Sequence, residues 1–211
     1  WKLQFEIYAI GIPASVTNIM ATFAVALTNR YLIVYGADSV AAMGIAMKAN
    51  MIINMVIVGF AFGAQPLIGY VYGAKDEQRF NKVVKFDIQV VASLAFMLTI
   101  ILFIFAPQVI RIFMNDPQIV KEGALMLRWL SVSTTLAGII LVFTTMFQSM
   151  GKATPAFWLS FCRQGLIFGV VISISAKLFG YTGIIAAQAI SDCLTFILAL
   201  IFFYCYRPRF K

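Results

Sequence analysis

Long windows without any charged residue restrict the fold of this chain more than any other feature of its sequence. In the window from Trp129 to Gly151, for example, no side chain is charged. A helix needs roughly 20 predominantly apolar residues to cross a hydrocarbon core of about 30 Å. Because lipid offers no hydrogen bonds, the backbone of such a segment must pair within itself, as an α-helix does. The windows therefore predict an all-α, polytopic membrane protein.

The number of these windows predicts a bundle of six transmembrane helices. Only 11% of the 211 residues are charged, whereas about a quarter of the residues of a soluble domain are charged. Residues 13–206 are expected to form the six-helix lobe, residues 1–12 a cytoplasmic linker or interfacial segment, and residues 207–211 a basic cytoplasmic tail. The predicted spans are residues 13–35, 39–72, 84–106, 117–150, 155–179 and 183–206.

Short polar side chains stand at the starts of five predicted helices, where they can accept hydrogen bonds from the N–H groups of the first turn. Two of them precede a proline, at the helical position where the missing N–H costs nothing. These two are Asp116 before Pro117 and Thr154 before Pro155. The five predicted N-caps are Asp38, Asp76, Asp116, Thr154 and Thr182.

The distribution of Lys and Arg predicts the orientation in the membrane. The chain has 16 Lys and Arg residues and a net charge of +8. If both termini are cytoplasmic, the larger share of these residues lies inside, as the positive-inside rule requires. The charge then follows from topology and does not indicate a nucleic-acid partner. The residues placed inside are Lys2, Lys75, Arg79, Lys82, Lys85, Lys152, Arg163, Arg207, Arg209 and Lys211.

The residue types that are absent or isolated argue against an enzyme. The chain has no histidine, so His-based acid–base catalysis and HExxH zinc sites cannot be built. Its cysteines, Cys162, Cys193 and Cys205, have no CxxC spacing and fall inside predicted spans, where they are typical small apolar fillers. We therefore expect no catalytic residue, no metal site and no bound cofactor.

Three of the predicted helices carry an uncharged polar stripe. In each helix these residues fall on one face at 100° per residue. Such stripes predict a water-accessible cavity with flexible methionines that suit irregular organic substrates. The alternative is that the same residues hold helices together. The stripes contain Asn18, Thr22 and Asn29, then Met43, Met47, Asn54 and Gln65, then Thr134, Gly138, Thr145 and Gln148. The expected substrate-cavity residues are Asn18, Thr22, Met47, Asn54, Gln65, Thr145 and Gln148.

The second predicted helix ends in a segment that combines hinge and packing signals. Pro66 removes a backbone hydrogen bond and crowds the carbonyl of Phe62, which predicts a kink. Small residues at GxxxG spacing let a second helix approach closely. The predicted hinge or packing residues are Gly63, Pro66, Gly69 and Gly73.

Two ionisable residues, Arg163 and Asp192, are expected well inside the last two spans. Because these spans are antiparallel neighbours, the two side chains can pair or share Gln164 and Gln188. Charged residues inside a membrane are costly and often functional. The sequence leaves open whether this buried charge pair has a structural role or a gating and coupling role.

Three stretches resemble, in order and spacing, the second half of bacterial MATE (multidrug and toxic compound extrusion) transporters. They are "GFAFGAQPLIGYVYGAKDEQRF", "FQSMGKATPAFWLSFCRQGLIF" and "GYTGIIAAQAISD". The resemblance implies one lobe of a twelve-helix transporter of the bacterial inner membrane, with a six-helix N-terminal lobe as its missing partner. It also implies exchange of Na⁺ or H⁺ for small organic, often cationic, compounds, with membrane lipid around the lobe.

The chain departs from the family pattern at positions that bear on ion coupling. Val71 stands where the family turn usually has asparagine. The first and fourth spans lack the carboxylates that some subgroups carry there. Glu6 precedes the first span, and Glu122 lies in the first turns of the fourth, which are expected in the interface before the uncharged window from Trp129 to Gly151. We therefore expect the coupling site in the N-terminal lobe. The alternatives are a lipid-linked sugar flippase of the same superfamily and a non-transporting scaffold lobe. An intramembrane enzyme is disfavoured because Asp192 is expected to have no second intramembrane carboxylate.

Overall fold

The computed structural model describes residues 2–206, with side chains from Ser15 onward except that of Thr17. No strand occurs in this part of the chain. Its elements are α1 (Lys2–Leu32), the short 3-10 helix η1 (Ile33–Tyr35), α2 (Ala37–Gly73), α3 (Glu77–Phe113), α4 (Pro117–Ser149), α5 (Ala153–Phe161), the π-helix η2 (Cys162–Leu166) and α6 (Ile167–Tyr206).

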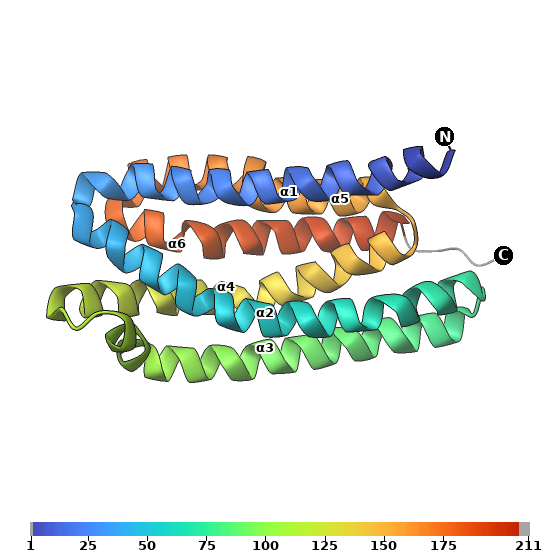
Figure 1. The fold of residues 1–211 in the computed structure, drawn as a ribbon, viewed down its shortest axis with the longest axis horizontal. Helices are drawn as coiled ribbons and strands as arrows, with labels where there is room; N and C mark the ends of the chain where they lie inside the picture. Colours follow the sequence, from blue (N-terminus) through green and yellow to red (C-terminus); the bar gives the residue numbers. More distant parts are fainter. Residues whose placement is uncertain (1, 207–211) are drawn as a thin grey trace.

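The helices form one elongated bundle in which α4 is central (Figure 1). α1 lies along one edge and α3 along the other, and α4 packs against α2, α3, α5 and α6. The most apolar window of α4 is 72% buried, against 17% for α2 and for α3. The start of α1 and the end of α6 lie at the same end of the bundle (Figure 1).

α6 is two antiparallel arms joined at Gly180. This glycine has φ 57° and ψ −130°, a conformation that side chains disfavour. A Cβ at Gly183 would clash with the Ser175 carbonyl oxygen, so the fold-back also requires the second glycine. The chain thus passes along the bundle six times, which confirms the predicted six-helix fold. In the described residues, the stretches long and apolar enough to cross a membrane are Ala37–Gly73, Glu77–Phe113, Pro117–Ser149 and Ala153–Tyr206.

Two of the predicted N-caps are confirmed. The Asp76 side chain accepts a hydrogen bond from the Arg79 N–H. The Asp116 side chain accepts from the N–H groups of Gln118 and Ile119.

The other three predicted caps are wrong. α2 begins after Gly36, so Asp38 lies inside its first turn. α5 begins after Lys152, so Thr154 is likewise already helical. Thr182 lies within α6, its hydroxyl donates to the Phe179 carbonyl 3.4 Å away, and no N–H of the described residues donates to it.

The first helix starts earlier than predicted. α1 is helical from Lys2, whereas the sequence placed the start at Pro13. Proline fixes one φ and lacks one donor, but a continuing helix can accommodate it where neighbouring groups satisfy the backbone. The assignment of residues 1–12 as a cytoplasmic linker or interfacial segment and of residues 207–211 as a cytoplasmic tail stays a prediction, and the tail lies outside the described residues.

At the end of the bundle opposite the start of α1, Glu122 connects three turns by hydrogen bonds. One of its carboxylate oxygens accepts from the Ser39 hydroxyl at 2.6 Å and from the Tyr181 hydroxyl at 3.0 Å. These bonds, the Ser39 bond first, hold the pKa of Glu122 below its ordinary value. Burial, together with the bond to Glu122, raises the pKa of Tyr181 to about 12. The starts of α2 and α4 and the turn in α6 therefore share one carboxylate.

Candidate functional site

A cavity of about 430 Å³, open on one side, lies within the bundle among α2, α4, η2 and the second arm of α6, and Val25 of α1 also lines it. Polar and small side chains from all four elements reach it, and methionines stand at its edge. Its polar, glycine and methionine lining consists of Met47, Asn50, Met51, Asn54, Ser133, Thr134, Gly138, Arg163, Gln164, Gln188 and Asp192.

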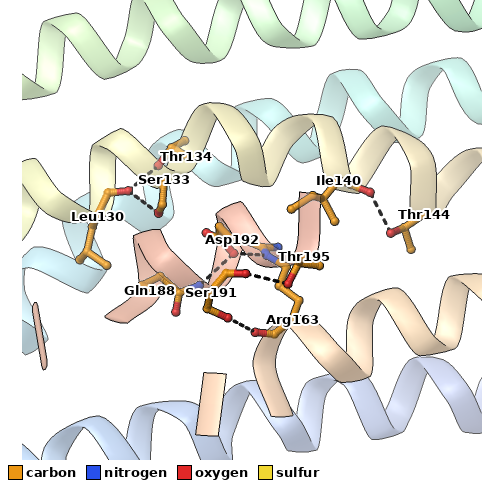
Figure 2. Close-up of polar contacts among 10 residues, drawn as sticks. All are labelled: Leu130, Ser133, Thr134, Ile140, Thr144, Arg163, Gln188, Ser191, Asp192 and Thr195. Atoms are coloured by element: carbon orange, nitrogen blue, oxygen red, sulfur yellow. Dashed lines mark hydrogen bonds and ion pairs between the residues drawn. The ribbon is translucent and has the colours of Figure 1, made fainter. Parts of the chain in front are cut away.

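The cavity contains a buried ion pair (Figure 2). Arg163 Nε donates to Asp192 Oδ1 at 2.8 Å, and Gln188 Nε2 donates to the same oxygen at 3.2 Å. The Asp192 side chain is fully buried, whereas that of Arg163 is 21% exposed. The structure thus places the predicted pair in contact, together with Gln188, and the carboxylate charge is compensated.

Two acceptor atoms in this cluster have no hydrogen-bond partner. They are Asp192 Oδ2 and Gln164 Oε1, both buried. A buried acceptor without a partner costs free energy, so each has capacity for a donor from water or a ligand. The cluster is therefore neutral in charge but still able to accept hydrogen bonds.

The π-helix directs two consecutive polar side chains toward the cavity. In η2 the Ile167 N–H donates to the Cys162 carbonyl five residues earlier, which widens the turn by one residue. Arg163 and Gln164 consequently both line the cavity. The hydroxyl of Ser191 on α6 donates to the Arg163 carbonyl at 3.0 Å (Figure 2), so the wide turn gains a partner beside Asp192. π-turns are frequent at functional sites.

Sequence reasoning missed this π-helix. The only signal was the run of Arg163 and Gln164 followed by glycine, in an otherwise apolar helix. A Cβ at Gly165 would meet the Met20 sulfur of α1 at 2.9 Å, so the glycine permits the close approach of α1 at the same turn.

The polar groups of α2 and α4 at the cavity are hydrogen-bonded, one pair between the helices and the rest within each helix. Thr134 Oγ1 donates to Asn50 Oδ1 at 3.1 Å, and Asn54 Nδ2 donates to the Asn50 carbonyl at 3.0 Å. The hydroxyls of Ser133 and Thr134 both lie within bonding distance of the Leu130 carbonyl (Figure 2). These bonds fix the orientation of the polar wall and lower the cost of burying it.

Some of the predicted substrate-cavity residues reach this cavity and others do not. Met47 and Asn54 line it. Asn18 and Thr22 are exposed on α1 and do not line it, although the Thr22 hydroxyl lies 3.2 Å from the Asn18 carbonyl. A stripe predicts a polar face, but the packing of α1 against α5 and α6 decides what that face meets.

The remaining predicted residues lie toward the other end of α2 and α4. Thr145 is fully buried and donates to the Val142 carbonyl at 3.0 Å. Gln65 and Gln148 are half-buried and do not line this cavity. A shared role of all seven residues in substrate binding stays a prediction.

The predicted hinge residues have different surroundings. α2 remains helical through Pro66 to Gly73. A Cβ at Gly69 would contact the Ser149 backbone of α4 at 3.5 Å, whereas a Cβ at Gly63 or Gly73 would have no atom within 4 Å. Only Gly69 of these glycines therefore sits against another helix within the described bundle.

One buried carboxylate was missed by the sequence analysis. Asp87 on α3 falls within the predicted third span, is 5% exposed, and has its Oδ2 atom without a partner. The sequence analysis singled out only Arg163 and Asp192 as ionisable residues well inside the spans, although the predicted third span, 84–106, already included Asp87 near its start. Asp87 does not line the cavity of Asp192, so the two carboxylates form no catalytic pair.

Comparison with known proteins gives a consistent result. The MatE family model matches residues 13–175. The multidrug export protein MepA of Staphylococcus saprophyticus is 29% identical over 208 residues, which cover 99% of this chain and 46% of MepA. The MepA protein of Staphylococcus haemolyticus is 28% identical, covering 97% of this chain and 45% of that protein.

Solved structures share the fold. A mutant of the Vibrio cholerae MATE transporter VcmN superposes with a TM-score of 0.87 at 16% identity, covering 95% of this chain and 46% of that chain. An outward-facing multidrug resistance MATE family transporter superposes with a TM-score of 0.88 at 20% identity, with the same coverage.

The fold defines a polytopic, all-α membrane protein with a polar cavity inside a six-pass bundle. By its sequence the chain belongs to the MatE family, that of the multidrug and toxic compound extrusion transporters. It spans about half the length of the relatives that it matches.

Proposed function

We propose that this chain is the C-terminal lobe of a cation-coupled exporter of small organic compounds. The observation that carries the proposal is the internal cavity, whose polar wall comes from four separate elements and whose one carboxylate is compensated by Arg163. Membership of the MatE family and the half-length match to MepA support it. A second six-helix lobe would supply the other wall, since transporters of this kind bind between two repeats.

The chemistry of the cavity suits varied organic compounds. Met47 and Met51 offer flexible, polarizable apolar surface, which adapts to irregular shapes. Asn54 and the free acceptors near Asp192 offer hydrogen bonds. We propose Na⁺ or H⁺ as the coupling ion, bound mainly in the other lobe. We also propose that both termini face the cytoplasm of the bacterial inner membrane.

Export of ethidium from drug-sensitive bacteria that express the chain in its native gene context tests the function. Asn54→Leu removes a polar group from the cavity wall, so we expect the KM for export to rise several-fold. Met97→Leu, on the exposed face of α3, is the matched control and should leave export unchanged. Absence of energy-dependent export of ethidium and of other organic cations by the unmodified protein would contradict the proposal.

A lipid-linked sugar flippase is less well supported. Its pyrophosphate-bearing substrate would require uncompensated cationic groups in the cavity. The cavity's one Arg among the described residues is Arg163, and its charge is paired with Asp192.

A further inference from the structure

A second hollow lies between α2 and α3, and it shares no lining residue with the internal cavity. Its volume is about 700 Å³, within the range of about 300–1,000 Å³ typical of pockets for drug-sized ligands. All of its lining residues are apolar or glycine except Asp87. We call it the α2–α3 groove.

Two glycines of α2 create the depth of this groove. A methyl group added at Gly59 or Gly63 would have no atom within 4 Å, so nothing in the described chain fills the space above them. Large apolar side chains stand at the sides of the groove and are strongly exposed. They are Met55, Phe60, Leu67 and Phe86. The groove therefore offers an apolar floor with aromatic walls.

Asp87 is the single charged group of the groove. Its side chain is almost completely buried, and Oδ2 has no hydrogen-bond partner. No described residue forms an ion pair with it, and the nearest basic residues in sequence, Lys82 and Lys85, are exposed. A buried carboxylate without a compensating cation is costly. One cationic group in the groove would therefore compensate the charge of Asp87.

The depth of Asp87 suits an amphiphile. It lies ten residues after Glu77 at the start of α3, about 15 Å along the helix at 1.5 Å per residue. It is also three residues beyond Val84, where the predicted span begins. A ligand held there keeps its charged end near the interface and its apolar body in hydrocarbon, as amphipathic side chains do.

We propose that the α2–α3 groove binds a lipophilic organic cation, a compound with an aromatic or aliphatic body and one protonated amine. The ammonium group donates to Asp87, and the body lies over Gly59 and Gly63. Phe60 and Phe86 add cation–π attraction. Anionic amphiphiles are repelled by the carboxylate, and neutral ones gain nothing from it. The site is separate from the internal cavity, and binding to it does not depend on export.

Photolabelling with three matched probes tests this site. Each probe is a phenyl trifluoromethyl diazirine on a butyl chain that ends in an ammonium, a hydroxyl or a sulfate group. The chain, expressed in its native gene context, is placed in phosphatidylcholine nanodiscs, and labelled peptides are quantified by mass spectrometry. Labelling of the two groove segments, 55–67 and 83–90, is divided by that of residues 96–101 of α3, which include no buried and no charged residue. This ratio corrects for partitioning into the bilayer.

We expect the ammonium probe to give a groove ratio at least five-fold above that of the alcohol, and the sulfate a ratio below it. Asp87→Asn should reduce the ammonium ratio to that of the alcohol. The unchanged alcohol pattern in this variant shows that it folds. Asp38→Asn, an exposed carboxylate change at the other end of α2, should alter none of the ratios.

Three results would overturn the proposal. Equal ratios for ammonium and alcohol would show that the carboxylate does not select the ligand, as would a preference that persists in Asp87→Asn. Groove segments that no probe labels would show that another segment or a tightly held lipid covers the groove and supplies its cation.

Discussion

Two aspartates are buried in this bundle, and their surroundings are opposite. Asp192 lies in the internal cavity, where Arg163 and Gln188 both donate to one of its oxygens. Asp87 lies on the other side of α2, in an apolar groove, without any partner among the described residues. The first carboxylate is compensated from within the chain, and the second is left for a partner from outside.

The difference shows how α2 divides the lobe. Its polar residues Asn50 and Asn54 face the cavity, and its glycines Gly59 and Gly63 open the groove. Burial alone therefore does not define the role of a carboxylate in this protein. The role of a buried carboxylate depends on whether neighbouring helices contribute hydrogen-bond donors to it. Substituting the carboxylates and their neighbours one at a time tests this.

The largest effect should follow from breaking the compensated pair. Arg163→Ala leaves Asp192 buried without its cation, and removal of one partner of a buried pair costs about 3–5 kcal/mol. We expect a clear fall in the thermal unfolding temperature of the detergent-purified protein. The double variant Arg163→Met with Asp192→Leu should recover most of the loss, because it removes both charges. A single variant as stable as the unmodified protein would show that the pair is not compensating.

A change in stability of the opposite sign is expected when Asp87, in the groove between α2 and α3, is neutralised. Asp87→Asn keeps a buried polar side chain but removes its uncompensated negative charge, whose burial is costly, so the gain should be on the order of 1 kcal/mol. We expect the unfolding temperature to rise when no ligand is present. The gain should shrink when the ammonium probe described above is added, since only the unmodified groove then gains a partner. A destabilised Asp87→Asn protein would contradict the contrast between the two carboxylates.

A smaller effect on stability should distinguish the closely packed wall of the internal cavity from the open floor of the α2–α3 groove. A Cβ at Gly138, which lines the cavity, would lie 3.1 Å from Val91 Cγ1 and 3.2 Å from Ile57 Cγ2. Gly138→Ala should therefore cost roughly 1 kcal/mol, at the low end for overpacking. Gly63→Ala in the groove meets no atom within 4 Å and should be neutral or slightly stabilising. Equal losses, measured by thermal unfolding, would mean that the groove is filled by another segment.

The smallest effect concerns Glu122, a carboxylate that is hydrogen-bonded but only partly buried. Its pKa lies below the ordinary 4.5 chiefly because of the Ser39 hydroxyl. A lowered folded-state pKa stabilises the protein above pH 4.5, and the contribution is lost as the pH falls through the folded value. Ser39→Ala should therefore destabilise the protein at pH 7 by roughly 0.5 kcal/mol, with the difference vanishing in acid. A loss that does not depend on pH would assign the effect to packing.

The sequence predicted the fold better than it predicted the site. Charge-free windows and turn residues placed the six passes, because a helix in lipid must satisfy its own backbone whatever its neighbours are. The caps at Asp76 and Asp116 were found for the same reason, since they bond within their own first turn. Thr182 is not a cap, because the fold-back at Gly180 leaves it already inside the helix, where its hydroxyl donates to the preceding Phe179 carbonyl.

The site depended on contacts between distant segments. The stripe of α2 led correctly to a polar face with Met47 and Asn54, but the similar stripe on α1 is turned away from the cavity. The sequence gives only a weak signal for the π-helix, because the hydrogen bond that supports its wide turn comes from Ser191, which is 28 residues from Arg163. Asp87 lies only three residues inside the predicted third span, between exposed lysines and apolar residues, so its burial became evident only in the structure.

The sequence by itself determined that this chain is a membrane protein of six helices, with a net charge of +8 and two residues of opposite charge, Arg163 and Asp192, inside its last two spans. These properties follow from local rules, namely the backbone's need for hydrogen bonds and the cost of charge in hydrocarbon. Only the tertiary structure decided which polar faces meet, and hence that Asp192 is compensated while Asp87 is not. The physical reason is that compensation depends on the three-dimensional approach of donors from other helices, and a helix's own sequence does not specify which neighbour will cover each of its faces.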